Sequence, residues 1–302
     1  MVVLVRWVGL IALASLMTLS AEAPQPNAAA VERGVLPPTW ITGASCPETP
    51  QFRIHEYNPD FFILRQSGCT NFEKPFLYVI FGRRSALLVD TGAANADVAA
   101  AVREAMARWS ATHAGASLPL IAAHSHGHGD HIAGDAQLKD LPNTTFVAAT
   151  PEALQRFFGF HNWPNDTVSY DLGDRVIDLV AIPGHQPASI AIYDRRTGIL
   201  LSGDTLYPGR LYVRDQAAFT ASIRRLVEFT RDKTVTHILG AHIENARTPY
   251  VDYPEGTKYQ PDEHALELGR AHLLELDDAL REMAGHVVRR ALRDFTIWPV
   301  ER

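Results

Sequence analysis

The sequence predicts an α/β protein with one layered domain. Short runs of Phe, Ile, Val and Leu, bounded by turn residues, alternate with longer segments whose apolar residues recur at helical spacing. Chemically reactive residues follow directly after several of the predicted strands. In layered α/β architecture, groups that lie just beyond strand ends can meet at one edge of a sheet. The same observations therefore predict both the fold class and the place of the functional site.

The predicted elements follow one another without internal repeats. Those of the first half are, in order, strands at 61–66, 76–81 and 86–89, a helix at 95–112 with Asn95 as N-cap, and a buried strand at 118–123. The second half adds a strand at 145–149, a helix at 151–158, strands at 176–182, 188–193 and 198–201, a helix at 216–230, a strand at 235–239, a helix from 261–262 onward, and a last strand within 292–300.

The motif directly after the strand at 118–123 carries the chemistry. Residues 124–131 read His-Ser-His-Gly-His-Gly-Asp-His, and imidazole and carboxylate groups are the ligands that zinc and its neighbours prefer. The two glycines let the backbone bend so that neighbouring side chains converge. A histidine-rich surface loop is the alternative. His124 falls outside the register H-x-H-x-D-H, and we expect it to support the site from the strand end. The candidate ligands in that register are His126, His128, Asp130 and His131.

Three further candidate ligands follow predicted strands later in the chain. His185 ends a Pro-Gly-His segment, Asp204 lies in Ser-Gly-Asp-Thr, and His242 lies in Gly-Ala-His. Each signal alone is weak, because structural histidines and turn aspartates are common. Their combination with the motif at 124–131, in this order, is specific.

This combination resembles the metallo-β-lactamase fold superfamily, over residues from about 60 to 242. The resemblance implies a four-layer αββα sandwich with the metal site along the edge of the sheets. It also implies two divalent ions, with zinc as the expected metal. Asp90 matches a buried aspartate that supports the ligand loop in the family, and a plain turn is its alternative role. The implied ligands are His126, His128 and His185 for the first ion, Asp130, His131 and His242 for the second, and Asp204 as the bridge.

The resemblance implies a metal-dependent hydrolase acting on a small molecule. A hydroxide that bridges the two ions would attack a carbonyl carbon, and Asp130 would give a proton to the leaving group. The segment Ser-Gly-Asp204-Thr-Leu-Tyr207 is similar to the glyoxalase II and lactonase branch, which favours a lactone, ester, thioester or amide. In acyl-homoserine lactone lactonases, the tyrosine at this place touches the substrate carbonyl. We therefore expect Tyr207 to be catalytic, with packing at the rim as the alternative.

Other activities of the same fold stay open at this point. β-Lactamases usually carry Cys or Ser where this chain has Asp204, so a β-lactamase-like activity is disfavoured. Phosphodiester hydrolases share the full set of ligands. A mononuclear iron persulfide dioxygenase would keep the early histidines and use fewer ligands, so seven ligand positions favour two metals. A binding protein without catalysis is the least favoured alternative.

The segments before the domain indicate export. Residues 1–23 carry a positive charge, an apolar stretch and a small-residue cleavage site, as in a secretory signal peptide, with an uncleaved membrane anchor as the alternative. Residues 24–50 are rich in Pro and Ala and predict an extended lead segment, and residues 51–302 form the single domain. We expect a periplasmic or secreted protein without stable membrane association after cleavage.

Charge and cysteine content agree with this assignment. The formal net charge is −6, whereas a protein that binds nucleic acid would favour a basic face. Cys46 and Cys69 are the only two cysteines, and an oxidising compartment permits a disulfide between them. Two unpaired buried thiols are the alternative.

Overall fold

The computed structural model describes residues 1–3, 30–40, 46, 49–139 and 141–300 of the chain. The described residues from 31 onward form one compact unit. The predicted signal peptide, residues 1–23, lies outside the described residues except for its first three. Within the described part of the chain, every helix is too short or too polar to cross a membrane.

Two six-stranded sheets form the centre of the domain. The first has the order β1-β2-β3-β4-β5-β6, with β1 (Phe52–Asn58), β2 (Phe61–Gln66), β3 (Phe76–Phe81), β4 (Ala86–Val89), β5 (Leu120–Ala123) and β6 (Thr144–Phe146). The second has the order β13-β12-β10-β9-β8-β7, with β7 (Thr167–Asp171), β8 (Val176–Ala181), β9 (Ile190–Asp194), β10 (Ile199–Gly203), β12 (His237–Gly240) and β13 (Glu267–Leu268). Strands β4, β5 and β6 run parallel, as do β10 and β12.

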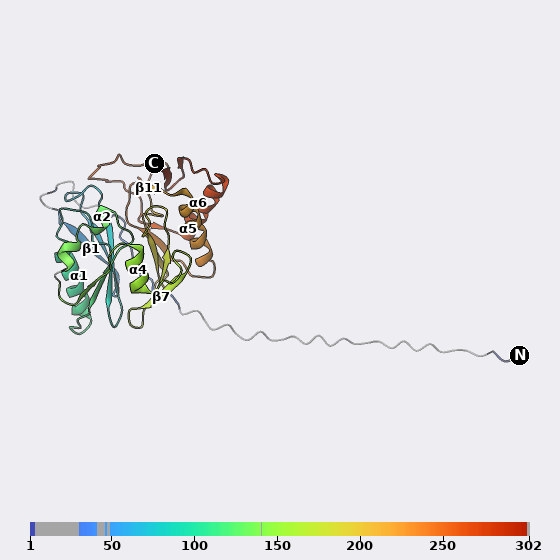
Figure 1. Cartoon of the computed structure of the whole chain (residues 1–302), viewed down its shortest axis with the longest axis horizontal. Helices are drawn as coiled ribbons and strands as arrows, with labels where there is room; N and C mark the ends of the chain where they lie inside the picture. Colours follow the sequence, from blue (N-terminus) through green and yellow to red (C-terminus); the bar gives the residue numbers. More distant parts are fainter. Residues whose placement is uncertain (4–29, 41–45, 47–48, 140, 301–302) are drawn as a thin grey trace. The chain divides into compact units, whose positions relative to one another are not determined.

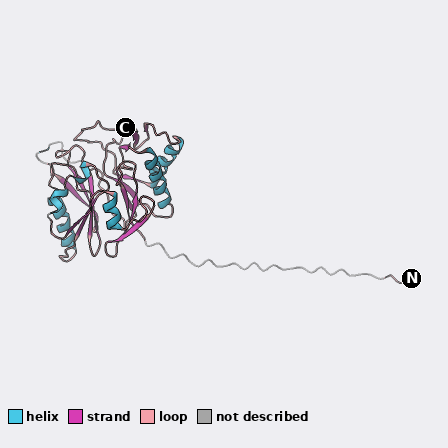
Figure 2. Ribbon diagram, in the orientation of Figure 1, coloured by secondary structure: helices cyan, strands magenta, loops and turns pink. Residues whose placement is uncertain are grey.

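Helices cover the outer face of each sheet (Figures 1 and 2). Helix α1 (Val98–Thr112) packs on the first sheet, and α5 (Gln216–Phe229) and α6 (Arg270–Glu282) pack on the second. Each helix turns an apolar stripe inward, which is what a surface helix needs for burial. The stripe of α5 consists of Phe219, Ile223 and Leu226. The arrangement is the four-layer αββα sandwich expected from the sequence.

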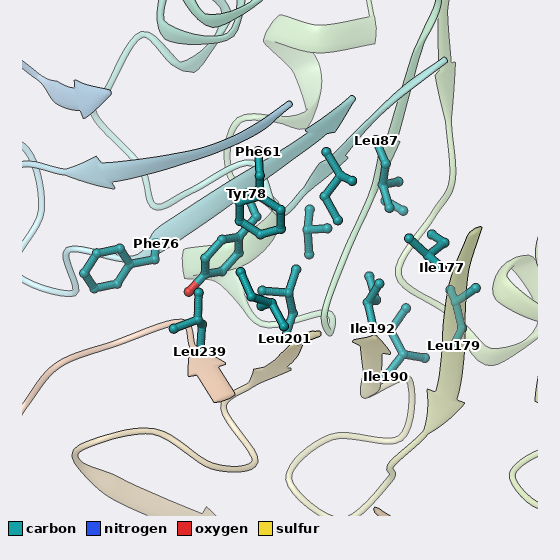
Figure 3. Close-up of a cluster of buried hydrophobic side chains, with 14 of the residues drawn as sticks. Phe61, Phe76, Tyr78, Leu87, Ile177, Leu179, Ile190, Ile192, Leu201 and Leu239 are labelled. Atoms are coloured by element: carbon teal, nitrogen blue, oxygen red, sulfur yellow. The ribbon is translucent and has the colours of Figure 1, made fainter. Parts of the chain in front are cut away.

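The main core lies between the two sheets (Figure 3). Strands that are buried on both faces read as continuous apolar runs, and β2, β3 and β4 have this character. This packing holds the two sheets face to face, so their strand ends share one edge. The residues labelled in the figure are Phe61, Phe76, Tyr78 and Leu87 of the first sheet, and Ile177, Leu179, Ile190, Ile192, Leu201 and Leu239 of the second.

A small third sheet joins the middle of the chain to its last strand. It has the order β11-β15-β14, with β11 (Arg210–Val213), β14 (Arg290–Ala291) and β15 (Thr296–Pro299). Strand β15 runs parallel to β11 and pairs Tyr212 with Trp298. The sequence predicted the last strand, whereas β11 carries no periodic signal of its own.

Several boundaries differ from the expected ones. Helix α1 begins at Val98 because the side chain of Asp97 accepts a hydrogen bond from Ala100 N at 2.8 Å, so Asp97 rather than Asn95 is the N-cap. The last helix begins at Arg270, because β13 pairs with β12 before it and interrupts the helical pattern. The short helices are α2 (Gly129–Ile132), α3 (Asp135–Lys139) and α4 (Pro151–Phe158).

The predicted disulfide is present and joins the lead segment to the loop after β2. Cys46 and Cys69 are bonded, at a sequence separation of 23. Before the bridge, Val35 N donates to Tyr57 O at 3.0 Å, and the indole of Trp40 is buried. Residues 31–40 therefore pack on the domain, although the sequence placed the domain boundary at residue 51.

Candidate metal centre

Every candidate ligand lies just beyond the carboxyl end of a strand or in the short helix that follows one. His126 and His128 come after β5, and α2 then carries Asp130 and His131. The second sheet supplies the other three, which follow β8, β10 and β12. These are His185, Asp204 and His242. The strand-end regularity seen in the sequence therefore corresponds to one physical edge shared by both sheets.

Four side chains form a first cluster. The Nδ1 atom of His128 lies 3.0 Å from Nε2 of His126 and 3.0 Å from Nε2 of His185. Oδ2 of Asp204 completes the cluster, at 3.7 Å from His126 Nε2 and 3.5 Å from His185 Nε2. All four ligand atoms lie within 4.8 Å of one another. Three ring nitrogens and one carboxylate oxygen thus face a common point.

A second cluster uses the other oxygen of the same aspartate. Oδ1 of Asp204 lies 3.5 Å from Nε2 of His131 and 3.4 Å from Nε2 of His242. Oδ2 of Asp130 lies 3.1 Å from each of the same two nitrogens. Asp204 therefore directs one oxygen to each cluster, as a bridging ligand does. The structure brings together all seven candidate ligands named from the sequence.

In most of the clustered histidines, the ring nitrogen that faces away from the cluster contacts a polar atom of a neighbouring residue. His185 Nδ1 lies 2.9 Å from Tyr212 O, and His242 Nδ1 lies 2.9 Å from Glu73 O. A carbonyl can only accept, so in both residues Nδ1 carries a hydrogen and Nε2 is the atom that faces the cluster. Such support orients metal-binding histidines and raises their basicity.

Asp90 supports the ligand loop as the resemblance implied. Its Oδ2 accepts from His131 Nδ1 at 2.9 Å, and its Oδ1 accepts from Ser125 N at 2.7 Å. The buried His124 lies outside both clusters, where its Nδ1 is 3.1 Å from His131 O and its Nε2 is 3.4 Å from Asp135 Oδ1. Both residues thus contact the ligand loop from behind.

The two clusters differ in their electrostatics. Burial lowers the pKa of His185 to about 4 and holds the pKa of His126 well below its usual value. Burial alone would also lower the pKa of His242, but Asp204 and Asp130 raise it to about 9. In turn His242 and His131 hold the pKa of Asp204 well below its usual range, against the effect of burial. The first cluster therefore offers neutral imidazoles, and the second attracts positive charge.

The donor set fits two divalent ions of the zinc type. Each cluster offers three or more nitrogen and oxygen donors, the number that zinc sites use, without sulfur. Oδ1 of Asp204 is buried and has no hydrogen-bond partner among the described residues. A buried carboxylate oxygen without a partner is costly, and a cation between it and the ring nitrogens removes that cost.

Tyr207, the predicted catalytic tyrosine, lies beside His242 of the second cluster. Its hydroxyl donates to Arg210 O at 2.5 Å and lies 3.3 Å from Glu244 Oε2, while its ring packs edge-on against His242 at 5.7 Å. The side chain is buried. The hydroxyl proton is thus directed away from the clusters, and the catalytic role of Tyr207 stays a prediction.

The sequence reading missed the residues that act through their backbone. Glu73 and Tyr212 orient His242 and His185 with carbonyl oxygens, which every residue type possesses. Glu244, two residues after His242, was also missed. Burial raises its pKa, and it accepts a hydrogen bond from Arg210 N at 2.7 Å. Its proximity to a candidate ligand was the only available signal.

The comparison with protein families agrees with this geometry. The sequence profile of the metallo-beta-lactamase superfamily matches residues 72–242, which is more than half of the chain. The chain belongs to this superfamily. The matched stretch contains all seven clustered side chains and ends at the last of them, so the superfamily assignment and the site rest on the same residues.

Curated relatives are named hydroxyacylglutathione hydrolase. The protein of Methylococcus capsulatus is 30% identical over 106 residues, which cover 34% of this chain and 41% of the relative. The protein of a Synechococcus species is 28% identical over 214 residues, covering 65% of this chain and 75% of the relative. In several of these matches, this chain spans less than half the length of the relative.

Solved structures show the same fold at low identity. The metallo-beta-lactamase FIM-1 from Pseudomonas aeruginosa, in its mono-zinc form, aligns with a TM-score of 0.53 at 16% identity, covering 80% of this chain and all of that one. TMB-1 aligns with a TM-score of 0.53 at 15% identity, covering 78% and 100%. At these identities the likeness supports the fold and carries no statement about substrate.

Proposed function

We propose that the protein is an exported, dinuclear, zinc-dependent hydrolase that cleaves a carbonyl substrate: a lactone, ester, thioester or amide. One observation carries the proposal. Asp204 turns Oδ2 to a cluster of three histidines and Oδ1 to a cluster of two histidines and Asp130. A shared carboxylate between two complete donor sets is the arrangement that two adjacent ions require.

The protein groups have separate tasks in this proposal. His126, His128 and His185 would hold the first ion, and Asp130, His131 and His242 the second. When bound, the two ions supply a hydroxide nucleophile near neutral pH and positive charge for the developing oxyanion. Asp90, Glu73 O and Tyr212 O fix the imidazole rings before substrate arrives, which lowers the reorganisation needed in the reaction.

Asp130 is the candidate carrier of the proton that reaches the leaving group. His131 and His242 hold its pKa well below the usual range, so it must first take that proton from the attacking water. Its side chain is 21% exposed, compared with 8% for Asp204, so substrate can reach it. In the overall reaction one water is consumed. Its oxygen forms a new bond to the acyl carbon, the bond from that carbon to the leaving sulfur, oxygen or nitrogen breaks, and a proton passes to the leaving atom. The products are a carboxylic acid, which releases the second proton of the water as it ionises, and a thiol, alcohol or amine.

Three further observations support the proposal. The curated relatives named above are hydroxyacylglutathione hydrolases, which makes a thioester the first substrate to try. The signal-like residues 1–23 and the disulfide between Cys46 and Cys69 favour an oxidising compartment, such as the periplasm or the exterior. The formal charge of −6 favours a small-molecule substrate over nucleic acid.

The test combines metal analysis with a substrate panel. Purified protein is loaded with zinc, desalted and analysed for metal, and is then assayed on a lactone, an acyl thioester, an aryl ester, a β-lactam and a phosphodiester. We expect about two zinc ions per chain and turnover of at least one of the carbonyl substrates.

Two results would contradict the proposal. One is a single tightly bound iron that excludes a second metal, combined with oxygen consumption in the presence of a persulfide. The other is exclusive turnover of the phosphodiester. Asp174→Asn is the control for substitutions of the clustered aspartates, because it removes an exposed carboxylate whose ion pair with Arg83 lies outside both clusters.

A further inference from the structure

A cavity opens on the first cluster of the metal centre. Its volume is about 640 Å³, and the imidazoles of His128 and His185 form part of its wall. The opposite walls come from α4, from the loop between α4 and β7, and from the start of α5. The residues of these walls include Pro151, Gln155, Trp163, Pro164, Asp215 and Ala218.

The wall of this cavity combines an apolar surface with polar side chains at its margin. The polar and charged residues are His128, Glu152, Gln155, His185, Gln186, Arg214 and Asp215. Trp163 and four prolines form much of the apolar surface, and proline has no backbone N–H to donate. Several of the polar side chains are already bonded to nearby backbone. Gln155 Nε2 donates to Pro151 O at 3.1 Å, and Asp215 Oδ1 accepts from Ala218 N at 3.0 Å. Pockets of this size and character take apolar groups in proteins.

The loop that carries Trp163 is fixed before any ligand binds. The indole packs edge-on against Phe160, with ring centroids 5.2 Å apart, and Phe160 is itself buried. Asp166 Oδ2 accepts from His161 N at 2.7 Å and from Asn162 N at 3.1 Å, which ties the loop to its own backbone. A preformed pocket binds without the entropic cost of ordering the loop.

The position of the cavity assigns it to one end of the substrate. Its wall includes His128 and His185 of the first cluster, whereas Asp130, the candidate proton donor to the leaving group, belongs to the second cluster. A larger cavity of about 940 Å³ adjoins the second cluster, where Glu73, Ile243 and Glu244 line it beside His242. The leaving group therefore belongs on the Asp130 side, and the acyl group on the Trp163 side.

We propose that the cavity at Trp163 binds the acyl group of the substrate and selects for aliphatic or aromatic acyl chains. Trp163 is the specificity-determining residue, because it is the largest apolar side chain in the wall. The inference rests on the proposed hydrolase function and adds the chemical class of one half of the substrate.

The experiment measures chain-length dependence on both sides of the scissile bond. Zinc-loaded protein is assayed on acetyl, butanoyl, hexanoyl and octanoyl thioesters of one short thiol, and on acetyl thioesters of thiols of increasing length. Burial of each added CH₂ is expected to raise kcat/KM about threefold to fourfold in the acyl series until the cavity is full. The thiol series is expected to show a much weaker dependence.

Trp163→Ala is expected to flatten the acyl series. The octanoyl substrate should lose about tenfold or more in kcat/KM, while the acetyl substrate changes by less than about twofold. Phe157→Leu is the matched control, since Phe157 lies on α4 and stacks on Tyr170 outside the cavity. Ala218→Phe tests the opposite wall and should move the optimum to shorter acyl chains, which keeps the inference testable if Trp163→Ala folds poorly.

Calorimetric binding of octanoate and acetate separates this inference from the proposed function. Zinc-loaded wild type should bind octanoate more tightly than acetate, and Trp163→Ala should remove most of that difference. Two outcomes overturn the acyl assignment. In one, the acetyl substrate is hydrolysed but kcat/KM does not rise with acyl chain length. In the other, Trp163→Ala lowers kcat/KM for the long thiols and not for the long acyl chains. If no substrate is hydrolysed, the proposed function fails, and equal binding of octanoate by wild type and Trp163→Ala then overturns the pocket as well.

Discussion

Nδ1 of His131 lies 2.9 Å from Oδ2 of Asp90, a buried carboxylate whose other oxygen is bonded to the backbone N–H of Ser125. One aspartate thus links the strand end after β5 to a histidine of the second cluster. Asp90 itself adopts a left-handed backbone conformation, with φ of 69°. A non-glycine residue in that conformation carries strain, which the three hydrogen bonds to its carboxylate offset.

Asp90→Asn tests this link. Asparagine keeps the size of the side chain but replaces one accepting oxygen by a donor, which cannot accept from His131 Nδ1. We expect zinc affinity or turnover to fall by about tenfold to a hundredfold. Competition titration with a chelating dye measures the affinity, and Asp174→Asn is the control. Unchanged affinity for both ions would show that Asp90 only forms a turn.

Asp204→Ala should have the largest effect on metal content. It removes the one carboxylate that both clusters share, and it leaves three donors in each. We expect the zinc content to fall from about two ions per chain to one or fewer, with loss of nearly all turnover. Elemental analysis after desalting gives the stoichiometry. Retention of two ions by the variant would mean that the clusters are independent sites.

Tyr207→Phe separates two roles of one hydroxyl. If the hydroxyl stabilised the oxyanion, kcat would fall about tenfold to a hundredfold with both metals retained. The observed bond to Arg210 O instead predicts a loss of about 1 kcal/mol in the free energy of unfolding with nearly unchanged kcat. We expect the second result. Urea unfolding and steady-state kinetics on the same preparation measure the two quantities, and a large fall in kcat at unchanged stability would restore the catalytic role.

Reduction of the disulfide should lower stability. The bridge between Cys46 and Cys69 closes a loop with a separation of 23 residues, so its removal should cost about 3 kcal/mol by the chain-entropy estimate. The melting temperature of oxidised protein is compared with that of reduced protein and of Cys46→Ala/Cys69→Ala. Two titratable thiols in protein isolated from an oxidising compartment would be the contrary finding.

Lys74 should make stability depend on pH in the alkaline range. Burial lowers the pKa of Lys74 from 10.5 to about 8, an effect that nearby Arg65 increases. Between about pH 8 and pH 10.5 the unfolded chain keeps a proton that the folded chain has lost, so this group makes the free energy of unfolding rise with pH. Over this whole interval the free energy of unfolding would rise by on the order of 3 kcal/mol.

The control for this effect is Lys74→Met, which keeps the length and removes the charge. Urea unfolding of both proteins is measured at intervals from pH 7 to the highest pH at which each refolds. Above about pH 8, the free energy of unfolding of the wild type should rise relative to that of the variant. A difference that is constant over this range would place the ammonium group in a solvated position.

The ligands could be predicted because their signals are local. The motif at 124–131 is continuous in sequence, and His185, Asp204 and His242 each follow a recognisable apolar strand. The supporting carbonyls could not be predicted, because any residue can provide one. Glu73 O reaches His242 only through the packing of the two sheets, and the sequence records no trace of that contact.

The weaker elements were missed for a related reason. Strand β11 is only four residues long, and its partner β15 lies more than 80 positions later. Such pairing depends on how the rest of the domain packs rather than on the strand propensity of the two segments. The cavity at Trp163 has the same origin, since α4, the loop after it and α5 form it jointly. Sequence periodicity locates elements, and tertiary contact decides which side chains share a cavity.

The pairing of β11 with β15 also bears on when the site is completed during biosynthesis. His185 takes its backbone partner from Tyr212 of β11, and β11 pairs with β15, which is translated after all seven clustered residues. A nascent chain that has reached His242 already contains all seven ligands but still lacks β15. We therefore expect the ligand set to be translated before its geometry is fixed, so that stable metal binding follows the synthesis of β15.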